Sequence, residues 1–179
     1  SSDLLLTDRR PQERIADPDL KVLFVMELRD LIVPESVVAH VRGSSKKALL
    51  QDIAARAATV YGIDQRRVLD ALLERERLGS TALGRGTAAP HARLEGIDRV
   101  CGVFCQLDRP IDFDAPDDAP VDLVFALIAP QDTGAEHLLA LAKVSRTLRD
   151  QAITAKLRSC ADNAALYAVL TEERISRAA

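Results

Sequence analysis

The sequence predicts a single α/β or α+β domain, and three observations support that class. Amphipathic helical patterns are interspersed with two strongly apolar segments of strand length, residues 100–107 and 121–129. The chain has 179 residues, close to the usual length of one domain. Apolar residues make up 47% and charged residues 28%, an ordinary composition for a chain that can bury a core without staples.

The first 25 residues differ from the rest of the chain. Residues 8–13 are polar, a proline follows at position 18, and Met26 is the single methionine. We therefore expect the domain to span residues 26–179, with residues 1–25 as an N-terminal extension or as residues added upstream. No charged head followed by an apolar stretch is present, so we expect no secretory signal.

Two helices are predicted after an apolar strand that contains His40. Residues 44–47 form a helix entrance, Gly62 ends that helix, and Asp64 caps the next one, which Gly79 terminates. Each helix has one buried stripe. The stripe residues are Leu49, Ile53, Ala57 and Val60 in the first helix and Val68, Leu69, Leu72 and Leu73 in the second.

The remaining elements follow from the same patterns. Residues 80–91 have no apolar period and are predicted to form a loop, and residues 108–120 form a turn-rich connection between two buried strands. Thr133 and Glu136 match a capping box, and Asp162 begins a final helix. The predicted inner faces consist of Leu138, Leu141, Ser145 and Leu148, then Leu166, Val169 and Leu170.

Charge and cysteine content exclude several classes of protein. With 24 Lys+Arg against 27 Asp+Glu, the net charge of −3 argues against a strongly basic nucleic-acid binder. Apolar runs are far too short to insert into a membrane. Cys101 and Cys105 would lie roughly 13 Å apart on one strand, too far for a disulfide. Three buried thiols are typical of a reducing, cytoplasmic compartment.

The three histidines have unequal prospects as functional groups. His40 alternates out of an apolar strand, as an ordinary surface histidine does. His91 follows a glycine-containing segment and Pro90, which together hold an imidazole beside backbone N–H groups, although a turn that merely ends in histidine fits equally well. His137 lies in a first helical turn, where the helix dipole favours an anion, but an exposed helical histidine is the more common case.

Charged and hydroxyl side chains precede His91. Arg75 lies in the last turn of the second helix, where it either complements the helix dipole or serves a site, and Ser80 and Thr81 follow at once. Together with His91, these residue types in one short stretch indicate a binding site for an oxyanion. A dinucleotide fingerprint at residues 84–89 is rejected because no strand precedes it and a proline interrupts the helix that it needs. No metal-ligand spacing is present, so no metal is expected.

Three separate segments resemble one family. LERERLGSTALGRGTAAPHARL (residues 73–94) is similar to the active-site segment of the fructose/mannitol-type enzyme IIA domains of the bacterial phosphotransferase system. GVFCQLDRPIDFDAPDDAPVDLVFALIAP (102–130) and EHLLALAKVSRTLRD (136–150) resemble the same family, most closely its nitrogen-regulatory branch. The resemblance covers about residues 26–171. It implies a mixed β-sheet with helices on both sides.

The resemblance also implies roles for individual residues. His91 matches the phosphoryl acceptor, and His137 matches a second active-site histidine. Arg75 matches the active-site arginine, and Ser80, Thr81 and Gly86 are matched as phosphate-binding residues. No cofactor is implied. The chain departs from the family at Ala92, where glycine is common, and at Arg85, which adds a cation.

The implied partner is a small phosphocarrier protein of the NPr/HPr type that donates the phosphoryl group from its own histidine. The phosphorylated or free state would then regulate targets such as potassium-transport or sensor-kinase components. Two alternatives remain: a sugar-transport IIA that passes phosphate to a IIB partner, and a binding module that moves no phosphate.

Overall fold

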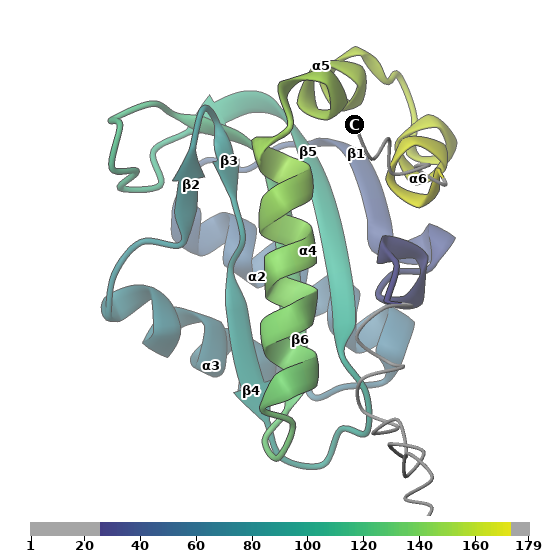
Figure 1. Cartoon of the computed structure of the whole chain (residues 1–179). Coiled ribbons are helices and arrows are strands. Elements are labelled where there is room, and N and C mark those ends of the chain that lie inside the picture. Colours follow the sequence, from purple (N-terminus) through teal and green to yellow (C-terminus); the bar gives the residue numbers. More distant parts are fainter. Residues whose placement is uncertain (1–25, 173–179) are drawn as a thin grey trace, which may run out of the picture.

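Strand β6 (Val121–Pro130) lies inside a six-stranded mixed sheet in a computed structural model, which describes residues 26–172 (Figure 1). It pairs antiparallel with β5 (Cys101–Ile111) and parallel with the short strands β3 (Thr87–Ala88) and β4 (His91–Leu94). Strand β1 (Val37–Val41) joins β5, and β2 (Ala82–Gly84) joins β3, which gives the order β1-β5-β6-β3-β2 with β4 also on β6. The predicted mixed sheet is confirmed.

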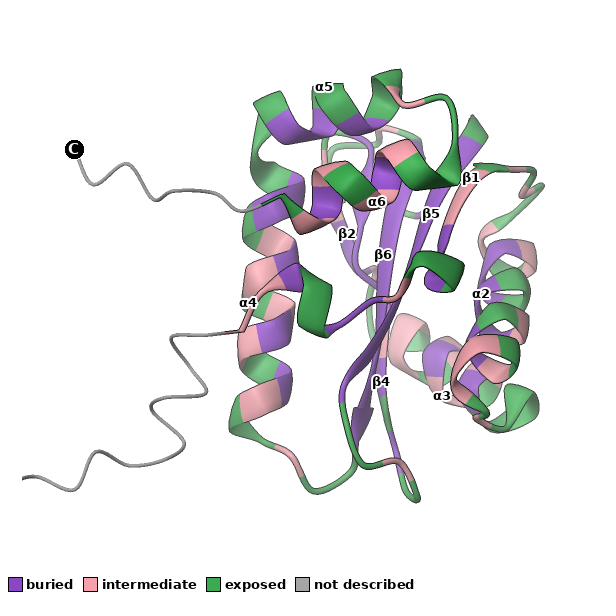
Figure 2. Cartoon of the chain, turned by 90° about the vertical axis from the view of Figure 1, so that its right-hand side faces the viewer, coloured by how far each residue is buried: buried purple, intermediate pink, exposed green. Residues whose placement is uncertain are grey.

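Helices cover both faces of this sheet, as predicted (Figures 1 and 2). Helices α2 (Lys46–Tyr61) and α3 (Gln65–Arg77) pack on one face. The other face carries α4 (Ala135–Arg149), α5 (Gln151–Ser159), α6 (Asn163–Thr171) and the 3-10 turn η1 (Leu28–Asp30), while η2 (Pro34–Ser36) precedes β1. Strands β5 and β6 are buried over most of their length because apolar clusters lie on both sides.

The predicted starts of α2, α3 and α6 are confirmed by their caps. Ser45, Asp64 and Asp162 each accept a hydrogen bond from a backbone N–H in the first turn that follows. Gly62 ends α2 at φ +67°, a conformation that suits glycine. Helix α5 was not expected, because its nine residues carry only a short apolar pattern; Asp150 caps it.

Residues 80–91 are not a loop, contrary to the prediction. They contain β2, β3 and the first residue of β4, and the hairpin turn between β2 and β3 uses positive φ angles at Gly84, Arg85 and Gly86. Small residues without an apolar period form strands here because β3 and β4 pair with buried β6. Strand β5 also extends past residue 107 to Ile111, beyond a register shift that leaves residues 108–110 exposed.

The predicted start of α4 is wrong, and its predicted inner face is right only in part: Leu148 is buried and Leu141 packs against the core, but Leu138 does not. Thr133 does not cap the helix; its hydroxyl donates to the Pro130 carbonyl, and Gly134 is the N-cap residue. Leu138 is 64% exposed, because α4 buries the neighbouring stripe. That stripe consists of His137, Ala140, Val144, Thr147 and Leu148. Selecting the stripe by its leucines fails because a buried histidine occupies the inward position.

Residues 1–25, predicted as an extension, lie outside the described residues, as do residues 173–179. Within residues 26–172, no helix combines the length and apolar character that crossing a bilayer requires.

The close approach of η1 to β5 gives a test of the packing. A Cβ at Gly102 would lie 2.7 Å from the Phe125 ring and 3.0 Å from Ile32 and from the Leu31 carbonyl. We expect Gly102→Ala to lower the free energy of unfolding by about 2 kcal/mol, as overpacking does, measured by urea denaturation. Gly134→Ala is the control, because a Cβ there meets nothing within 4 Å; equal stability of the two variants would contradict the packing described.

Candidate functional site

His91 lies at an outer edge of the sheet, where β4 begins. Its backbone is in register with Leu127 of β6, and the carbonyl of the preceding Pro90 accepts a hydrogen bond of 2.9 Å from the Leu127 N–H. Ala89 and Pro90 are buried, whereas His91 is half-buried. Pairing with the central strand therefore fixes the backbone that carries this imidazole, and the ring remains reachable from solvent.

One hydrogen bond sets the tautomer of His91. Its Nδ1 lies 2.9 Å from the backbone carbonyl of Ala89. A carbonyl oxygen only accepts, so Nδ1 carries the proton and the lone pair of the neutral ring is on Nε2. The His91 nitrogen that is able to act as a nucleophile is therefore Nε2.

His137 faces His91 from the first turn of α4. The two ring centroids are 5.6 Å apart and the rings are inclined by 64°. Nε of Arg93 donates to Nδ1 of His137 at 3.0 Å. The side chain of His137 is buried, and its Nε2 has no hydrogen-bond partner within the described part of the chain.

Both rings are neutral at neutral pH. Burial lowers the pKa of His91, and the nearby Arg75 guanidinium lowers it further, against the Ala89 hydrogen bond that raises it. Burial, the facing His91 and the Arg93 charge lower the pKa of His137 to about 4. A neutral imidazole keeps the lone pair that a nucleophile needs.

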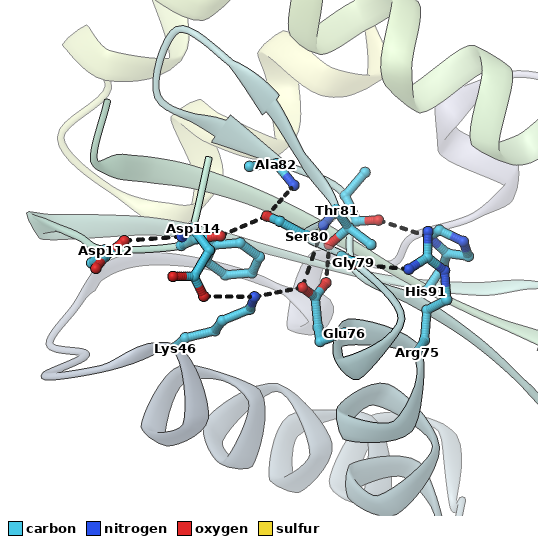
Figure 3. A network of polar contacts seen from close by, with 12 residues as sticks. Lys46, Arg75, Glu76, Gly79, Ser80, Thr81, Ala82, His91, Asp112 and Asp114 are labelled. Carbon is cyan, nitrogen blue, oxygen red and sulfur yellow. Dashed lines mark hydrogen bonds and ion pairs between the residues drawn. The ribbon is translucent and has the colours of Figure 1, made fainter. Parts of the chain in front are cut away.

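Arg75 is held beside His91 by the chain reversal after α3 (Figure 3). Its Nη1 donates to the Gly79 carbonyl at 2.9 Å. The next residue, Glu76, has a side chain that is 5% exposed and is paired with Lys46 of α2 at 2.7 Å. The Thr81 hydroxyl and backbone N–H donate to the same carboxylate. This network ties α2, α3 and the segment before β2 together next to His91 (Figure 3).

Three predicted site residues are engaged elsewhere in this structure. The Ser80 hydroxyl donates to the Phe113 carbonyl at 2.6 Å, and the Thr81 hydroxyl donates to Glu76. Gly86 lies in the β2–β3 turn, where a Cβ would come within 2.7 Å of Arg158. The next residue, Thr87, pairs with Leu123 of β6, which lies four residues before Leu127, the partner of His91. The structure thus brings together His91, His137 and Arg75. The backbone carbonyl of Thr81 also reaches this segment, because it accepts a hydrogen bond of 3.0 Å from the Ala89 N–H.

His40 lies on β1, at the opposite end of the sheet order. Its Nδ1 contacts Asp108 and its Nε2 contacts the Ala161 carbonyl, both at 2.7 Å. These two acceptors raise the pKa of His40. It is an exposed surface histidine, as its position in the sequence predicted.

Sequence reasoning missed Arg93 and Glu76. Arg93 lies two residues after His91 on one strand, so side-chain alternation could have placed both on the same face, but the prediction of a loop hid that signal. Glu76 has no neighbour in the sequence that marks it as a buried carboxylate. Its burial depends on Lys46, which lies 30 positions earlier and cannot be paired with it from the sequence.

The arrangement suits one kind of chemistry. An open nucleophilic nitrogen lies near a buried N–H donor and two guanidinium groups, so the site can accept an electrophile that carries negative charge. The first turn of α4 adds to this. Of the five α-helices in residues 26–172, α4 alone has no side-chain cap, so its first N–H groups remain available to an anion.

Comparisons with known proteins agree on one family. A family model described as phosphoenolpyruvate-dependent sugar phosphotransferase system, EIIA 2, matches residues 30–173. A nitrogen regulatory protein of Bradyrhizobium diazoefficiens is 49% identical over 145 residues, which are 81% of this chain and 95% of that protein. The nitrogen regulatory protein of Escherichia coli K12 is 39% identical over 82% of this chain and 91% of its own length.

Solved structures show the same fold. Nitrogen regulatory protein IIA-Ntr from Neisseria meningitidis superposes with a TM-score of 0.75 at 32% identity, covering 79% of this chain and 97% of that one. IIA mannitol from Escherichia coli has a TM-score of 0.62 at 23% identity over 73% of this chain and 92% of that one, a likeness of fold alone.

The two facing rings should titrate apart from His40. We expect His137 to titrate near pH 4, His91 below its ordinary 6.5, and His40 above 6.5, because burial opposes the charge of the first two and Asp108 favours the charge of the third. The measurement is an NMR titration of the ring protons, with single histidine substitutions for assignment. A midpoint of His137 near 6.5 would contradict the burial described.

The same shift affects stability. The unfolded chain binds a proton at His137 near pH 6.5, whereas the folded protein binds it only near pH 4. The stability that depends on a neutral His137 is therefore lost as the pH falls from 6.5 towards 4. We expect His137→Gln to show a smaller fall in urea midpoint between neutral pH and pH 5 than the unsubstituted protein shows; parallel falls would be the opposing result.

Proposed function

Because the chain belongs to the EIIA 2 family of the phosphoenolpyruvate-dependent sugar phosphotransferase system, we propose that Nε2 of His91 accepts a phosphoryl group from the phosphohistidine of a small carrier protein. The observation that carries the proposal is the hydrogen bond of His91 Nδ1 to the Ala89 carbonyl, which leaves Nε2 with the lone pair. The phosphorylated or free state of His91 then regulates partner proteins. The three free thiols suit a reducing compartment, which we take to be the cytoplasm.

The transfer step needs no proton movement at His91. The Nε2 lone pair forms the new N–P bond while the old N–P bond breaks, and its electron pair stays on the donor imidazole. In-line transfer spreads negative charge over the phosphoryl oxygens. The His91 ring gains positive charge, and Nδ1 keeps the proton that it donates to Ala89.

Residues around His91 stabilise the phosphoryl charge. His137, whose ring faces His91, offers an unpartnered Nε2–H, and the uncapped first turn of α4 supplies backbone N–H groups. Arg75 contributes a guanidinium from the other side of the sheet edge. Ser80 and Thr81 contribute indirectly, because their hydrogen bonds hold the segment that includes Gly79, whose carbonyl accepts from Arg75. Gly86 contributes by forming the hairpin turn between β2 and β3.

A regulatory role is favoured over transport. Relatives of 39% and 49% identity are named nitrogen regulatory proteins, and this chain spans more than nine-tenths of each. A fructose-specific EIIA component of Haloferax volcanii is 36% identical over a shorter match. We propose potassium-transport or sensor-kinase components as the kind of target. Transport would require a IIB protein that removes the phosphoryl group.

The acceptor is tested by intact-mass measurement after incubation with phosphoenolpyruvate, enzyme I and an active phosphocarrier. We expect one acid-labile phosphoryl adduct on the unsubstituted protein and none on His91→Ala, because the nucleophile is gone. His40→Ala is the matched control and should be labelled fully. Label on His91→Ala would refute the proposal. The absence of label on every variant, with a carrier that labels another IIA protein, would favour the binding module instead.

The stabilising residues are tested by transfer rates. We expect His137→Ala and Arg75→Ala each to slow phosphorylation by about a hundredfold, the loss typical of removing one donor to a developing anion. Urea midpoints check that both variants fold. His137→Gln keeps an N–H donor and should recover part of the rate. Rates equal to those of the unsubstituted protein in both alanine variants would remove these side chains from the proposed mechanism.

A further inference from the structure

We infer that Arg93 is a positioning residue, which fixes the tautomer of His137 and thereby presents an N–H donor to the group carried by His91. The inference about the donor's use rests on the proposed phosphoryl transfer, whereas the tautomer itself is a property of the free protein.

The tautomer follows from the donor inventory. Nε of Arg93 is 3.0 Å from Nδ1 of His137, and an arginine nitrogen only donates. Nδ1 of His137 must therefore accept, and in the neutral ring the proton is on Nε2. The low pKa of His137 supports this, because a charged ring would carry a proton on Nδ1 and would lose the hydrogen bond with Arg93.

The resulting N–H group has an unusual environment. His137 is 5% exposed, and its Nε2 has no partner among the described residues. Buried donors without acceptors are rare because they have lost their hydrogen bonds with water. This one lies on the ring that faces His91. An anionic group on His91 would supply the missing acceptor, so the orphaned donor is explained as part of the site.

Strand geometry couples Arg93 to the acceptor residue. His91 and Arg93 are two residues apart on β4, so their side chains leave the same face of the strand. Their backbones are in register with Leu127 and Ala129 of β6, which fixes both positions relative to the central strand. One short strand thus carries the nucleophile and the residue that orients the donor.

A purely electrostatic role for Arg93 makes different predictions. As a cation near the site it would act through charge alone, and any neighbouring cation would serve. Arg77 offers the comparison: it lies in the last turn of α3, pairs with Glu74, and has no hydrogen bond to either ring. Removing Arg77 changes the net charge by the same amount as removing Arg93.

The experiment combines spectroscopy with transfer rates on the full chain. Long-range ¹H–¹⁵N spectra of the ¹⁵N-histidine-labelled free protein at pH 7.5 should show His137 protonated on Nε2 and bare on Nδ1. In Arg93→Met the Nδ1 shift should move towards the average of two tautomers, and the rate of phosphorylation should fall about tenfold, the effect of losing one orienting hydrogen bond. Arg93→Lys should restore part of both, while Arg77→Met should change neither.

Each outcome bears on the inference. A proton on Nδ1 of His137 in the unsubstituted protein would overturn it, as would an unchanged tautomer and rate in Arg93→Met. Equal slowing of Arg93→Met and Arg77→Met with an unchanged spectrum would leave only a charge effect, and would also overturn it. If the free protein shows the expected tautomer but takes no phosphoryl group, the proposed function fails while the role of Arg93 in orienting His137 stands.

Discussion

The site depends on one constraint: strand β6 is apolar on both faces and must be covered on both. Helices α2 and α3 cover one side and α4, α5 and α6 the other, so two helix ends from opposite layers reach the same sheet edge. Strand β4 pairs with β6 at that edge and places His91 there. Arg75 arrives from the end of α3 and His137 from the start of α4. The need to bury β6 on both faces therefore brings His91, Arg75 and His137 to the same edge of the sheet.

Both histidines are neutral, but each for its own reasons and with its own tautomer. A carbonyl acceptor places the proton of His91 on Nδ1, and a guanidinium donor places the proton of His137 on Nε2. The two facing rings therefore present opposite properties, a lone pair on one and an N–H on the other. Neither tautomer is a property of the imidazole ring alone. Both tautomers are set by residues on or just before β4, so this short strand fixes the arrangement of the two rings.

Sequence patterns predicted the parts of the fold whose signals are local. Caps at Ser45, Asp64 and Asp162 and the apolar runs of β5 and β6 need no distant partner to be recognised, and the family resemblance implied the mixed sheet. The patterns failed where tertiary pairing decides: β2, β3 and β4 are strands only because β6 is beside them. Leu138 looked like a core residue because helical period alone cannot choose between adjacent stripes. The contact between Arg93 and His137 spans 44 positions, and only the folded chain brings it about.

The place of β4 at the sheet edge has a consequence for solubility. A strand with a free side exposes backbone groups on which another chain can add a strand, which is a common route to aggregation. Under the proposed function a carrier protein must reach His91, so this edge has to stay uncovered. The chain limits the hazard by other means: β4 is four residues long, a proline precedes it, and the exposed Arg93 carries a charge along it. Arg93, which we infer to orient His137, thus also opposes the addition of a strand from another chain at this edge.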